Sequence, residues 1–510
     1  MNQKTEKSGL SASEVRWLFW GCFIALVATS FAFVIRNIII GDWGMEFNLS
    51  ETQKGELLGV GLWPFGVSIV LFSLIADKIG YGRAMVFAFA CHLVSAILTV
   101  SATSYWMLYA GTFLVAFGNG TVEAVINPVI ATVYPKEKTK WLNILHAGWP
   151  GGMVIGGVIT LLVLGPDLHW RWKAALIFIP LAVYGLILLR CKFPVQERVQ
   201  AGVPYKVMLQ EAGIIGAVII VALLIGEIGR VFEWSYMVQF IVGGILVVAY
   251  AVSVKSLGRP LFIFLLLIMI PLATTELGTD SWITQLVEPI MVDLGAQAGW
   301  VIVYTAFIMT VLRFLAGPIV ERLQPLGLLA ISSVLAIIGL LFLSKAAGIV
   351  IFVAATVYGI GKTFFWPTML GIVAERFPKG GALTLNMISG VAMLSVGVIG
   401  AAFLGNIQDR EIDRDLQSQN PALHAQIVAP AKVSVFGKYN PLDQKKVAEI
   451  TPEEKSLLKT ITSTAKQNAL ATVAIFPAIM LVCYIILIFY FRSKGGYKPV
   501  EISHASGASP

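Results

Sequence analysis

Fourteen apolar segments, each about the length that a membrane-spanning helix requires, constrain the fold of this chain more than any other feature of its sequence. In hydrocarbon each spanning segment must satisfy its own backbone hydrogen bonds, and these segments lack the alternation of barrel strands. We therefore expect an all-α membrane protein. A mean hydropathy of +0.81 and a charged fraction of 13% exclude an ordinary soluble protein. The expected spans lie near residues 17–40, 56–76, 84–102, 105–133, 142–165, 174–189, 211–229, 235–254, 260–284, 298–318, 326–344, 347–374, 382–406 and 467–491.

The distribution of basic residues predicts the orientation of these spans. If the N-terminus lies inside, the short inner loops and tails hold twenty Lys and Arg residues, and the short outer loops hold five. Positively charged loops are retained in the cytoplasm, so both ends are expected there, in a bacterial inner membrane. Removing either 211–229 or 235–254 would invert every later loop and destroy this bias, so these two segments span as a pair or not at all. The first apolar segment is too long for a signal-peptide core and is expected to stay in the mature protein.

An internal repeat at an offset of 243 to 244 residues relates the two parts of the chain. Each pair of matching positions lies at a corresponding loop or span. Ser73, Asp77 and Lys78 match Gly317, Glu321 and Arg322 in one block, and Pro135, Leu142 and Asn143 match Pro378, Leu385 and Asn386 in a second block. An even number of spans separates the copies, so the repeats are parallel and predict two related six-helix halves. The expected layout is a cytoplasmic tail 1–16, a first bundle 17–190, a central linker 191–259 with two additional spans, a second bundle 260–491 with a polar outer insertion 407–466, and a cytoplasmic tail 492–510.

Residues 73–83 read Ser-Leu-Ile-Ala-Asp-Lys-Ile-Gly-Tyr-Gly-Arg. This stretch resembles the signature loop between helices 2 and 3 of the major facilitator superfamily, with Ser73 in place of the usual Gly. The resemblance implies two six-helix bundles around a central substrate cavity. The two additional helices expected between the bundles and the polar insertion at 407–466 depart from the usual twelve-helix pattern of that superfamily. It also implies conformational roles for the signature-loop residues Asp77, Lys78, Gly80, Arg83, Gly317, Glu321 and Arg322.

Two further stretches are similar to a group within that superfamily. Glu123 and Asn127 lie in a Glu-x-x-x-Asn-Pro segment that looks like helix 4 of the fucose permease group of sugar–proton symporters. The stretch 276–283 is similar to helix 7 of the same group and would make Glu276 and Trp282 cavity residues. The resemblance implies that Glu123 couples transport to protons.

Helix 1 departs from that group. It carries Arg36-Asn37 where the group has an Asn-Asp pair, so a relay of two carboxylates is unsupported. Arg36 and the segment 120–128 also resemble the anion–cation symporter group, which carries organic anions and sugar acids. An Arg in the cavity would suit a carboxylate substrate.

Charged side chains inside spans cost roughly 2.5 to 3.5 kcal/mol on insertion scales, so they are usually retained for pairing or function. Glu276 and Asp280 lie one helical turn apart on the same face, and Lys362 and Trp366 form a possible cation and aromatic platform for a sugar or an anion. His146 lies on the span beside Glu123 and is either a structural histidine or a proton shuttle. The candidate substrate-binding residues are Arg36, Asn127, His146, Glu276, Asp280, Trp282, Lys362 and Trp366.

The sequence therefore predicts a secondary transporter that moves a small polar solute by alternating access, with protons as the expected coupling ion. A neutral sugar is the preferred solute, and a sugar acid or another organic anion is the alternative. No nucleotide-binding or paired-histidine metal motif occurs, so neither a cofactor, a metal nor an enzymatic activity is expected. A non-transporting membrane receptor or a membrane-embedded enzyme remains the rival class. The expected partners are the solute, the coupling ion and the lipid bilayer, with no nucleic acid, and the protein is expected to work as a monomer.

Overall fold

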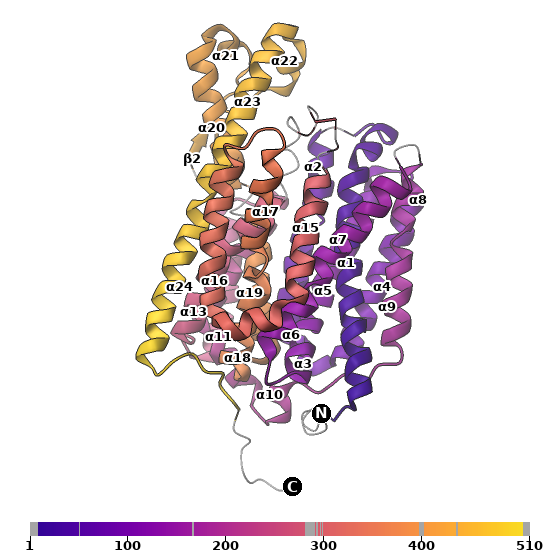
Figure 1. Ribbon diagram of the computed structural model, residues 1–510, viewed down its shortest axis with the longest axis vertical. Coiled ribbons are helices and arrows are strands. Elements are labelled where there is room, and N and C mark those ends of the chain that lie inside the picture. The colour runs from indigo at the N-terminus through magenta and orange to yellow at the C-terminus, as the bar shows by residue number, and fades with distance from the viewer. Residues whose placement is uncertain are drawn as a thin grey trace.

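A computed structural model describes residues 9–502 except 50, 166–167, 281–290, 292–293, 296, 298, 397–401 and 435–436. Its long helices run side by side, and the first and last described residues lie at the same end of the molecule (Figure 1). In the described part, 12 helices are long and apolar enough to cross a membrane. The remaining two expected spans hold the 16-residue helix α15 and the 15-residue helix α19. The prediction of an all-α membrane protein is confirmed.

The first bundle, called here the N-terminal half, is built from residues 9–190. Its helices are α1 (Ala12–Glu46), α2 (Glu51–Gly59), α3 (Trp63–Ile79), α4 (Tyr81–Val100), α5 (Tyr105–Val133), α6 (Lys138–His146), α7 (Gly148–Val158), the π-helix η2 (Ile159–Val163), α8 (Trp170–Ala175) and α9 (Phe178–Leu188).

Local sequence explains where several of these helices begin. The Ser11 hydroxyl accepts a hydrogen bond from the backbone N–H of Glu14, whose carboxylate accepts from the Ser11 N–H, so a capping box starts α1. Ser104 caps α5 through the N–H of Met107. Between α3 and α4, Gly80 has a φ of +85°, a conformation that favours glycine and allows the chain to reverse in one residue.

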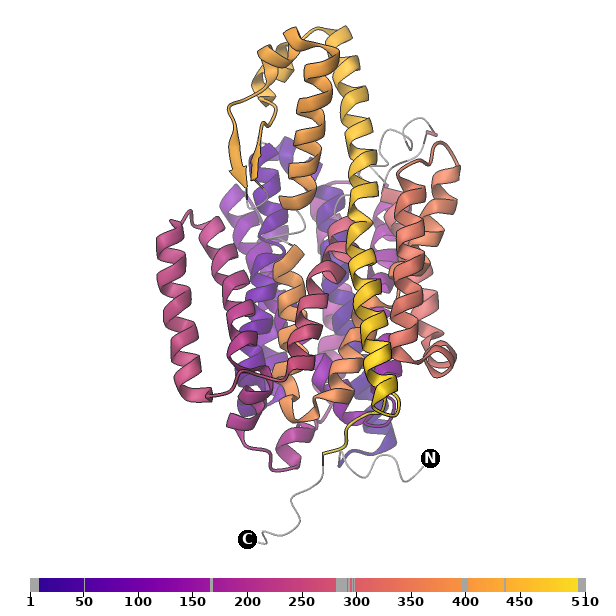
Figure 2. The same ribbon diagram turned by 90° about the vertical axis from the view of Figure 1, so that its left-hand side faces the viewer.

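Three helices lie between the two halves in sequence. They are α10 (Glu197–Gln200), α11 (Tyr205–Val231) and α12 (Tyr236–Val254). Helix α11 packs against α3, α13 (Pro260–Ala273) and α19 (Gly381–Ser395), and α12 packs on α11 at the outside of the molecule (Figure 2). Only 6% of the apolar window of α12 is buried, so lipid must cover most of this helix. Both segments of the additional pair are therefore helices long and apolar enough to cross a membrane.

The second bundle, called here the C-terminal half, is built from residues 260–396 and the last long helix. Its elements are α13, the π-helix η3 (Thr274–Gly278), α15 (Gly299–Phe314), α16 (Ala316–Leu343), α17 (Val350–Lys362), α18 (Phe365–Arg376), the 3-10 helix η4 (Pro378–Gly380), α19 and α24 (Ile475–Ser493).

The polar segment expected at 407–466 is a folded insertion at the end of the molecule opposite the described termini (Figures 1 and 2). It contains α20 (Ala402–Gln419), α21 (Pro421–Ile427), the paired strands β1 (Lys432–Ser434) and β2 (Gly437–Tyr439), α22 (Gln444–Glu449) and α23 (Pro452–Val473). Side chains such as Leu416, Leu423 and Ile461 form its own hydrophobic core. Helix α23 leads into the spanning helix α24, which anchors the insertion to the bundle.

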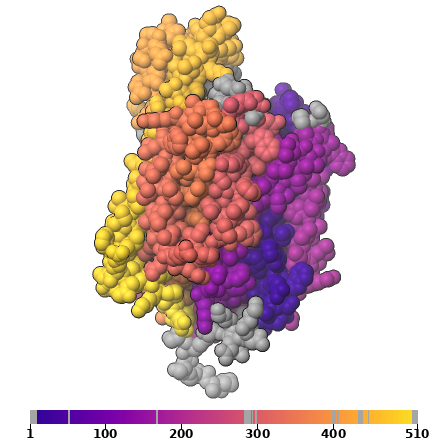
Figure 3. Space-filling view, viewed as in Figure 1, coloured from indigo at the N-terminus to yellow at the C-terminus, as the bar shows by residue number. Residues whose placement is uncertain are grey.

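The two halves stand side by side below the insertion (Figure 3). They meet where α3 packs on α19 and where α7 packs on α15. Glycines permit this close approach, because a Cβ at Gly66 would lie 2.9 Å from Leu394 Cδ2, and one at Gly157 would lie 2.7 Å from Val303 Cγ2. The interface between the halves is thus tightly packed in this conformation.

Candidate functional site

Glu123 lies in the middle of α5 and is buried, with only 4% of its surface exposed. One turn later, the Asn127 side-chain N–H donates to Glu123 Oε2 at 2.7 Å. The Asn127 Oδ1 lies 2.9 Å from His146 Nε2. Because an amide oxygen can only accept, the imidazole carries the proton of this hydrogen bond on Nε2. His146 Nε2 is also 4.0 Å from Glu123 Oε2. These three predicted residues therefore form one polar cluster inside the N-terminal half.

Pro128 connects this cluster to the other half. A proline in a helix has no N–H, so the carbonyl of Ala124, four residues earlier, loses its intrahelical partner. The side chain of Asn386 on α19 donates to that carbonyl at 2.8 Å. Asn143, the repeat partner of Asn386, likewise reaches across and donates to Thr368 Oγ1 at 3.2 Å. The two asparagines bridge the halves in opposite directions.

Two breaks in spanning helices meet at Arg313. Helix α6 ends at His146, α17 ends at Lys362, and helix ends leave carbonyl groups without backbone partners. Arg313 Nη1 donates to the carbonyl of His146 at 2.9 Å, and its Nε donates to the carbonyl of Thr363 at 2.7 Å. A single guanidinium therefore caps one broken helix from each half, where the negative ends of the helix dipoles favour a cation.

Glu276 completes this arrangement from the π-helix η3. Its Oε1 accepts from Arg313 Nη2 at 2.8 Å, and its Oε2 accepts from the backbone N–H of Trp366 at 3.2 Å. Trp366 lies in the first turn of α18, where a free N–H and the positive end of the helix dipole favour an anion. The Arg313–Glu276 ion pair thus satisfies the free carbonyl of Thr363 at the end of α17 and the free N–H of Trp366 at the start of α18.

A second ion pair, formed by the buried Lys362 and the partly buried Asp280, lies beside the first. Lys362 Nζ contacts Asp280 Oδ1, and the ammonium group also lies 5.3 Å from the centre of the Tyr358 ring. A small cavity of about 10 Å³ is lined by Glu276, Asp280 and Lys362 together with Trp149 and other apolar side chains of both halves. The halves enclose little free space at this point in the present conformation.

The remaining predicted binding residues lie elsewhere. The Trp366 ring is buried, and its Nε1 has no hydrogen-bond partner in the described part of the chain. Trp282 falls outside the described residues. Arg36 does not line the cavity that holds Lys362. It lines a separate cavity within the N-terminal half, so the structure does not bring these two cations together.

The signature-loop residues lie at the end of the molecule that carries the termini. Asp77 forms an ion pair with Arg198 of α10 at 2.8 Å, and Lys78 Nζ lies 4.1 Å from the centre of the Tyr205 ring. Gly80 supplies the turn described above, whereas Arg83 is exposed. The loop therefore binds the central linker.

The repeat-related loop contacts the N-terminal half directly. A Cβ at Gly317 would lie 3.1 Å from Cε of Lys140, and the Lys140 ammonium lies 3.9 Å from Glu321. Arg322 is exposed. This loop of the C-terminal half therefore packs against α6 of the N-terminal half.

Further polar contacts join the two halves at the end of the molecule that carries the termini. Glu375 Oε1 accepts from both the N–H and the hydroxyl of Thr139, at 3.1 and 2.6 Å. Lys138 donates to the carbonyl of Ala374 at 3.2 Å and pairs with Glu197 at 2.6 Å. We call this set of contacts between α6 and α18 the terminal gate.

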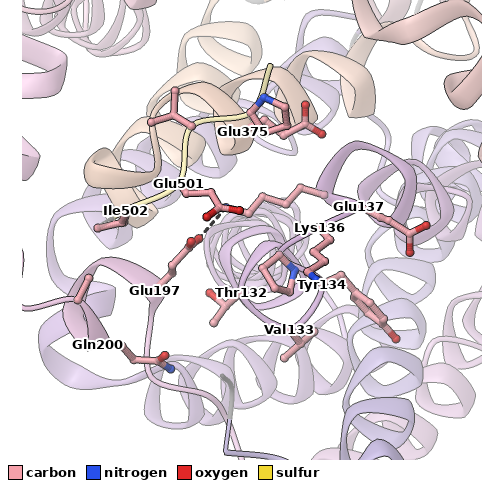
Figure 4. Close-up of a pocket in the computed structure, with 15 residues that line it drawn as sticks. Thr132, Val133, Tyr134, Lys136, Glu137, Glu197, Gln200, Glu375, Glu501 and Ile502 are labelled. Carbon is pink, nitrogen blue, oxygen red and sulfur yellow. Dashed lines mark hydrogen bonds and ion pairs between the residues drawn. The ribbon is translucent and has the colours of Figure 1, made fainter. Parts of the chain in front are cut away.

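The C-terminal segment lies across the terminal gate. Tyr497 donates to Glu375 Oε2 at 2.7 Å, and the N–H of Val500 donates to the Glu375 carbonyl at 2.8 Å. Burial and the neighbouring Glu375 raise the pKa of Tyr497 well above its usual range, so its phenol remains a proton donor. Figure 4 shows the adjoining cavity of about 580 Å³, into which Glu197, Glu375 and Glu501 converge from three parts of the chain.

Metal-binding chemistry has no support in the described residues, which hold no group of three or more His, Cys, Asp or Glu side chains able to share an ion. The chemistry of the site is instead that of paired charges. Two buried carboxylates, Glu123 and Glu276, and the partly buried Asp280 face two buried cations, Arg313 and Lys362.

Comparisons with known proteins agree with this architecture. The family model described as Major Facilitator Superfamily matches residues 18–205. The crystal structure of the fucose:proton symporter of E. coli superposes with a TM-score of 0.52 at 13% identity, and the match covers 90% of this chain and 98% of that one. The chain has the major facilitator fold. The predicted resemblance to that superfamily and its two-bundle architecture are confirmed.

Two further similar proteins differ in what their names say they carry. A human organic anion transporter superposes with a TM-score of 0.58 at 11% identity, over 92% of this chain and 99% of that one. A probable sugar efflux transporter of Helicobacter pylori (strain G27) is 22% identical over 208 residues, which are 40% of this chain and 52% of the relative. This chain therefore spans about half the length of the curated relatives that it matches.

Sequence reasoning missed the part that Arg313 plays. Four residues before Gly317, it reads from sequence as a structural partner of the second signature loop. Its contacts instead lie at the two helix breaks and at Glu276. The available signal was a cation inside an apolar segment, which the insertion cost marks as paired or functional. The terminal gate gave a weaker signal, because Thr139 and Glu375 lie just outside the expected spans, in stretches of ordinary polar composition.

Proposed function

We propose that this protein is a secondary active transporter that moves a small polar solute by alternating access and couples that movement to protons through Glu123. The charge balance of the central site carries the proposal. Glu276 is paired with Arg313 and Asp280 with Lys362, whereas Glu123 has an amide partner and no Lys or Arg within ion-pair distance among the described residues. The positive and negative charges of the site are equal in number when Glu123 is protonated. Loss of that proton leaves one buried negative charge without a compensating cation.

The same contacts couple that charge to the arrangement of the halves. Glu123 is joined through Asn127 and His146 to Arg313, which belongs to the other half. Loss of the proton from Glu123 therefore places a negative charge next to a network that holds both halves together. A change in protonation can bias which arrangement of the halves is favoured, as coupled transport requires.

Replacing Glu123 with Gln tests the coupling. We expect Glu123→Gln to abolish solute accumulation driven by a proton gradient in proteoliposomes while retaining counterflow exchange, which needs no net proton movement. Glu453→Gln, in the exposed first turn of α23, is the matched control and should retain both activities. If Glu123→Gln still accumulates solute against its gradient, Glu123 is not the coupling residue.

For the solute itself, we propose a neutral sugar or a closely related carbohydrate. The two cations near the central cavity are already paired with carboxylates, and Trp149 offers an aromatic face beside them. Such a site offers donors and acceptors to hydroxyl groups without net charge. The names of the fucose:proton symporter and of the sugar efflux transporter support the same class.

The alternative is a sugar acid or another organic anion, as the name of the human neighbour suggests. An anion would have to displace Asp280 from Lys362, and Arg36 lines a different cavity. A thermal-shift panel on the purified protein separates the two. We expect neutral sugars to stabilise the protein and hexonates to have no effect. Stabilisation by hexonates alone, lost in Lys362→Gln, would reverse this preference.

The proposal includes an orientation and a location. The positive-inside bias supports cytoplasmic termini in a bacterial inner membrane, and the terminal gate then faces the cytoplasm. The insertion of α20 to α23 would face the opposite side. A green fluorescent protein fused to the C-terminus should fluoresce in intact cells, because it matures in the cytoplasm. We further propose that the monomer is the functional unit, since both six-helix halves belong to one chain.

A further inference from the structure

A second buried cation lies apart from the proposed transport site. Arg36, in the outer part of α1, is only 6% exposed and lines a cavity of about 50 Å³ inside the N-terminal half. The walls of this cavity come from α1, α4 and α5 and from the segment around α8. No residue of the C-terminal half lines it, whereas the small central cavity is lined from both halves.

The guanidinium of Arg36 has no charged or hydrogen-bonding partner in the described part of the chain. Its Nε is buried without a hydrogen bond. The group packs closely on the backbone, because a Cβ at Gly61 would lie 2.2 Å from its Nη2. It also lies 5.7 Å from the centre of the Phe33 ring. A buried cation without an anion is costly, which implies that a partner reaches this cavity.

The other polar groups around this cavity do not supply the missing negative charge. Trp43 is 1% exposed, and its Nε1, which can only donate, has no partner. His92 uses Nδ1 for a contact with the Tyr184 hydroxyl at 2.9 Å, and its Nε2 is unpartnered. Hydroxyl groups and apolar side chains complete the lining, and no Asp or Glu is among the lining residues.

The nearest acidic side chains along α1 are already engaged. Asp42 lies 3.8 Å from Lys173, and Glu46 pairs with Arg171 at 2.8 Å. Neither forms an ion pair with Arg36. The cavity therefore gathers unpaired donors around one positive charge and offers no anionic acceptor.

We propose that this cavity binds one small monovalent inorganic anion of the size of chloride. The cavity volume of about 50 Å³ leaves room for such an ion, because a single water occupies about 30 Å³ in the liquid. A sugar acid with a six-carbon chain is far too large for it. The anion neutralises Arg36 and accepts hydrogen bonds from it and from Trp43, which ties α1 to the rest of the N-terminal half. This site is independent of the solute and proton sites proposed above.

Thermal unfolding of the purified full-length protein tests the site. In a titration of sodium chloride against sodium isethionate at constant ionic strength, we expect the melting temperature to rise with chloride and to saturate. Arg36→Gln should abolish this response. Trp43→Phe keeps an aromatic ring, although a smaller one, but removes the N–H donor, and should raise the half-saturating chloride concentration by about tenfold, the effect of one hydrogen bond to an ion.

Matched variants keep the result interpretable. Arg259→Gln removes an exposed cation that pairs with Glu211 near the linker, and it should respond to chloride as the wild type does. Should Arg36→Gln fail to fold, Trp43→Phe and Arg36→Lys still report on the site. In crystals soaked with sodium bromide, an anomalous peak is expected within hydrogen-bonding distance of the Arg36 guanidinium.

Three results would overturn the proposal. One is a wild-type melting temperature that does not distinguish chloride from isethionate. Another is a chloride response that survives in both Arg36→Gln and Trp43→Phe, since the ion would then bind elsewhere. The third is a loss of solute-induced stabilisation in Arg36→Gln without any chloride response in the wild type, which would assign Arg36 to the solute.

Discussion

At the scale of single residues, Arg313 shows how one side chain can hold two broken helices together. Its planar guanidinium donates in three directions, to the carbonyls of His146 and Thr363 and to the carboxylate of Glu276. A lysine carries the same charge on a flexible stem and cannot reproduce this fork. The geometry of the donor, as well as its charge, therefore matters at this position.

Substitutions at Arg313 should separate geometry from charge. We expect Arg313→Gln to lower the free energy of unfolding by about 3 to 5 kcal/mol, because Glu276 is left as an uncompensated buried charge. Arg313→Lys should be intermediate in stability and should lose most transport. Adding Glu276→Gln to Arg313→Gln should restore part of the stability, which a double-mutant cycle from denaturant unfolding would measure. Equal stability of wild type and Arg313→Gln would contradict the assigned role.

At the scale of secondary-structure elements, the sequence predicted where helices lie and not where they break. Length and apolar character determined the fourteen spans, and each contains a described helix. The breaks after His146 and Lys362 have a local signal in Pro150 and Pro367, which cannot donate to the carbonyls of His146 and Thr363 four residues earlier. The groups that satisfy these breaks lie on α15 and η3, far away in sequence. Glu123 and Asn127 were found through the resemblance of the Glu-x-x-x-Asn-Pro segment, which a single stretch of sequence carries. Contacts between the halves, such as Asn386 to Ala124, depend on tertiary packing that a local pattern does not encode.

The C-terminal segment is an element whose contribution can be measured directly. Tyr497 donates to Glu375, which also accepts two hydrogen bonds from Thr139 across the terminal gate. Tyr497→Phe removes one hydrogen bond to a carboxylate, worth about 1.5 to 3 kcal/mol, and should open the gate more often. A cysteine at Val133, which lines the adjoining cavity, should then react faster with a maleimide in inside-out vesicles.

This labelling experiment needs a background in which Cys22, Cys91, Cys191 and Cys483 are replaced. Tyr490→Phe is the control, because the Tyr490 side chain is 45% exposed on α24, and it should leave the rate unchanged. Equal labelling rates in Tyr497→Phe and in the parent would show that the C-terminal segment does not hold the gate. Labelling from outside intact cells would contradict the proposed orientation.

At the scale of the whole molecule, the two halves touch both at the terminal gate and along α7 and α15. Polar contacts close the gate, whereas the contact of α7 with α15 is a close packing of small and branched side chains. Alternating access requires the second contact to separate when the solute enters from the side of the insertion. The contact between Gly157 and Val303 lies toward that side of the interface and is close enough to be cross-linked.

A reversible cross-link at this contact should stop transport. A Cβ at position 157 lies 2.7 Å from Val303 Cγ2, so Gly157→Cys with Val303→Cys brings the two β-carbons within the range that a disulfide needs. Val303→Cys also removes Val303 Cγ2, with which a cysteine at position 157 alone would clash. In the cysteine-replaced background, oxidation should abolish both accumulation and counterflow, and dithiothreitol should restore them. Val303→Cys alone should transport equally with and without oxidant. Full activity of the oxidised double variant, with the cross-link verified by mass spectrometry, would show that α7 and α15 do not separate during transport.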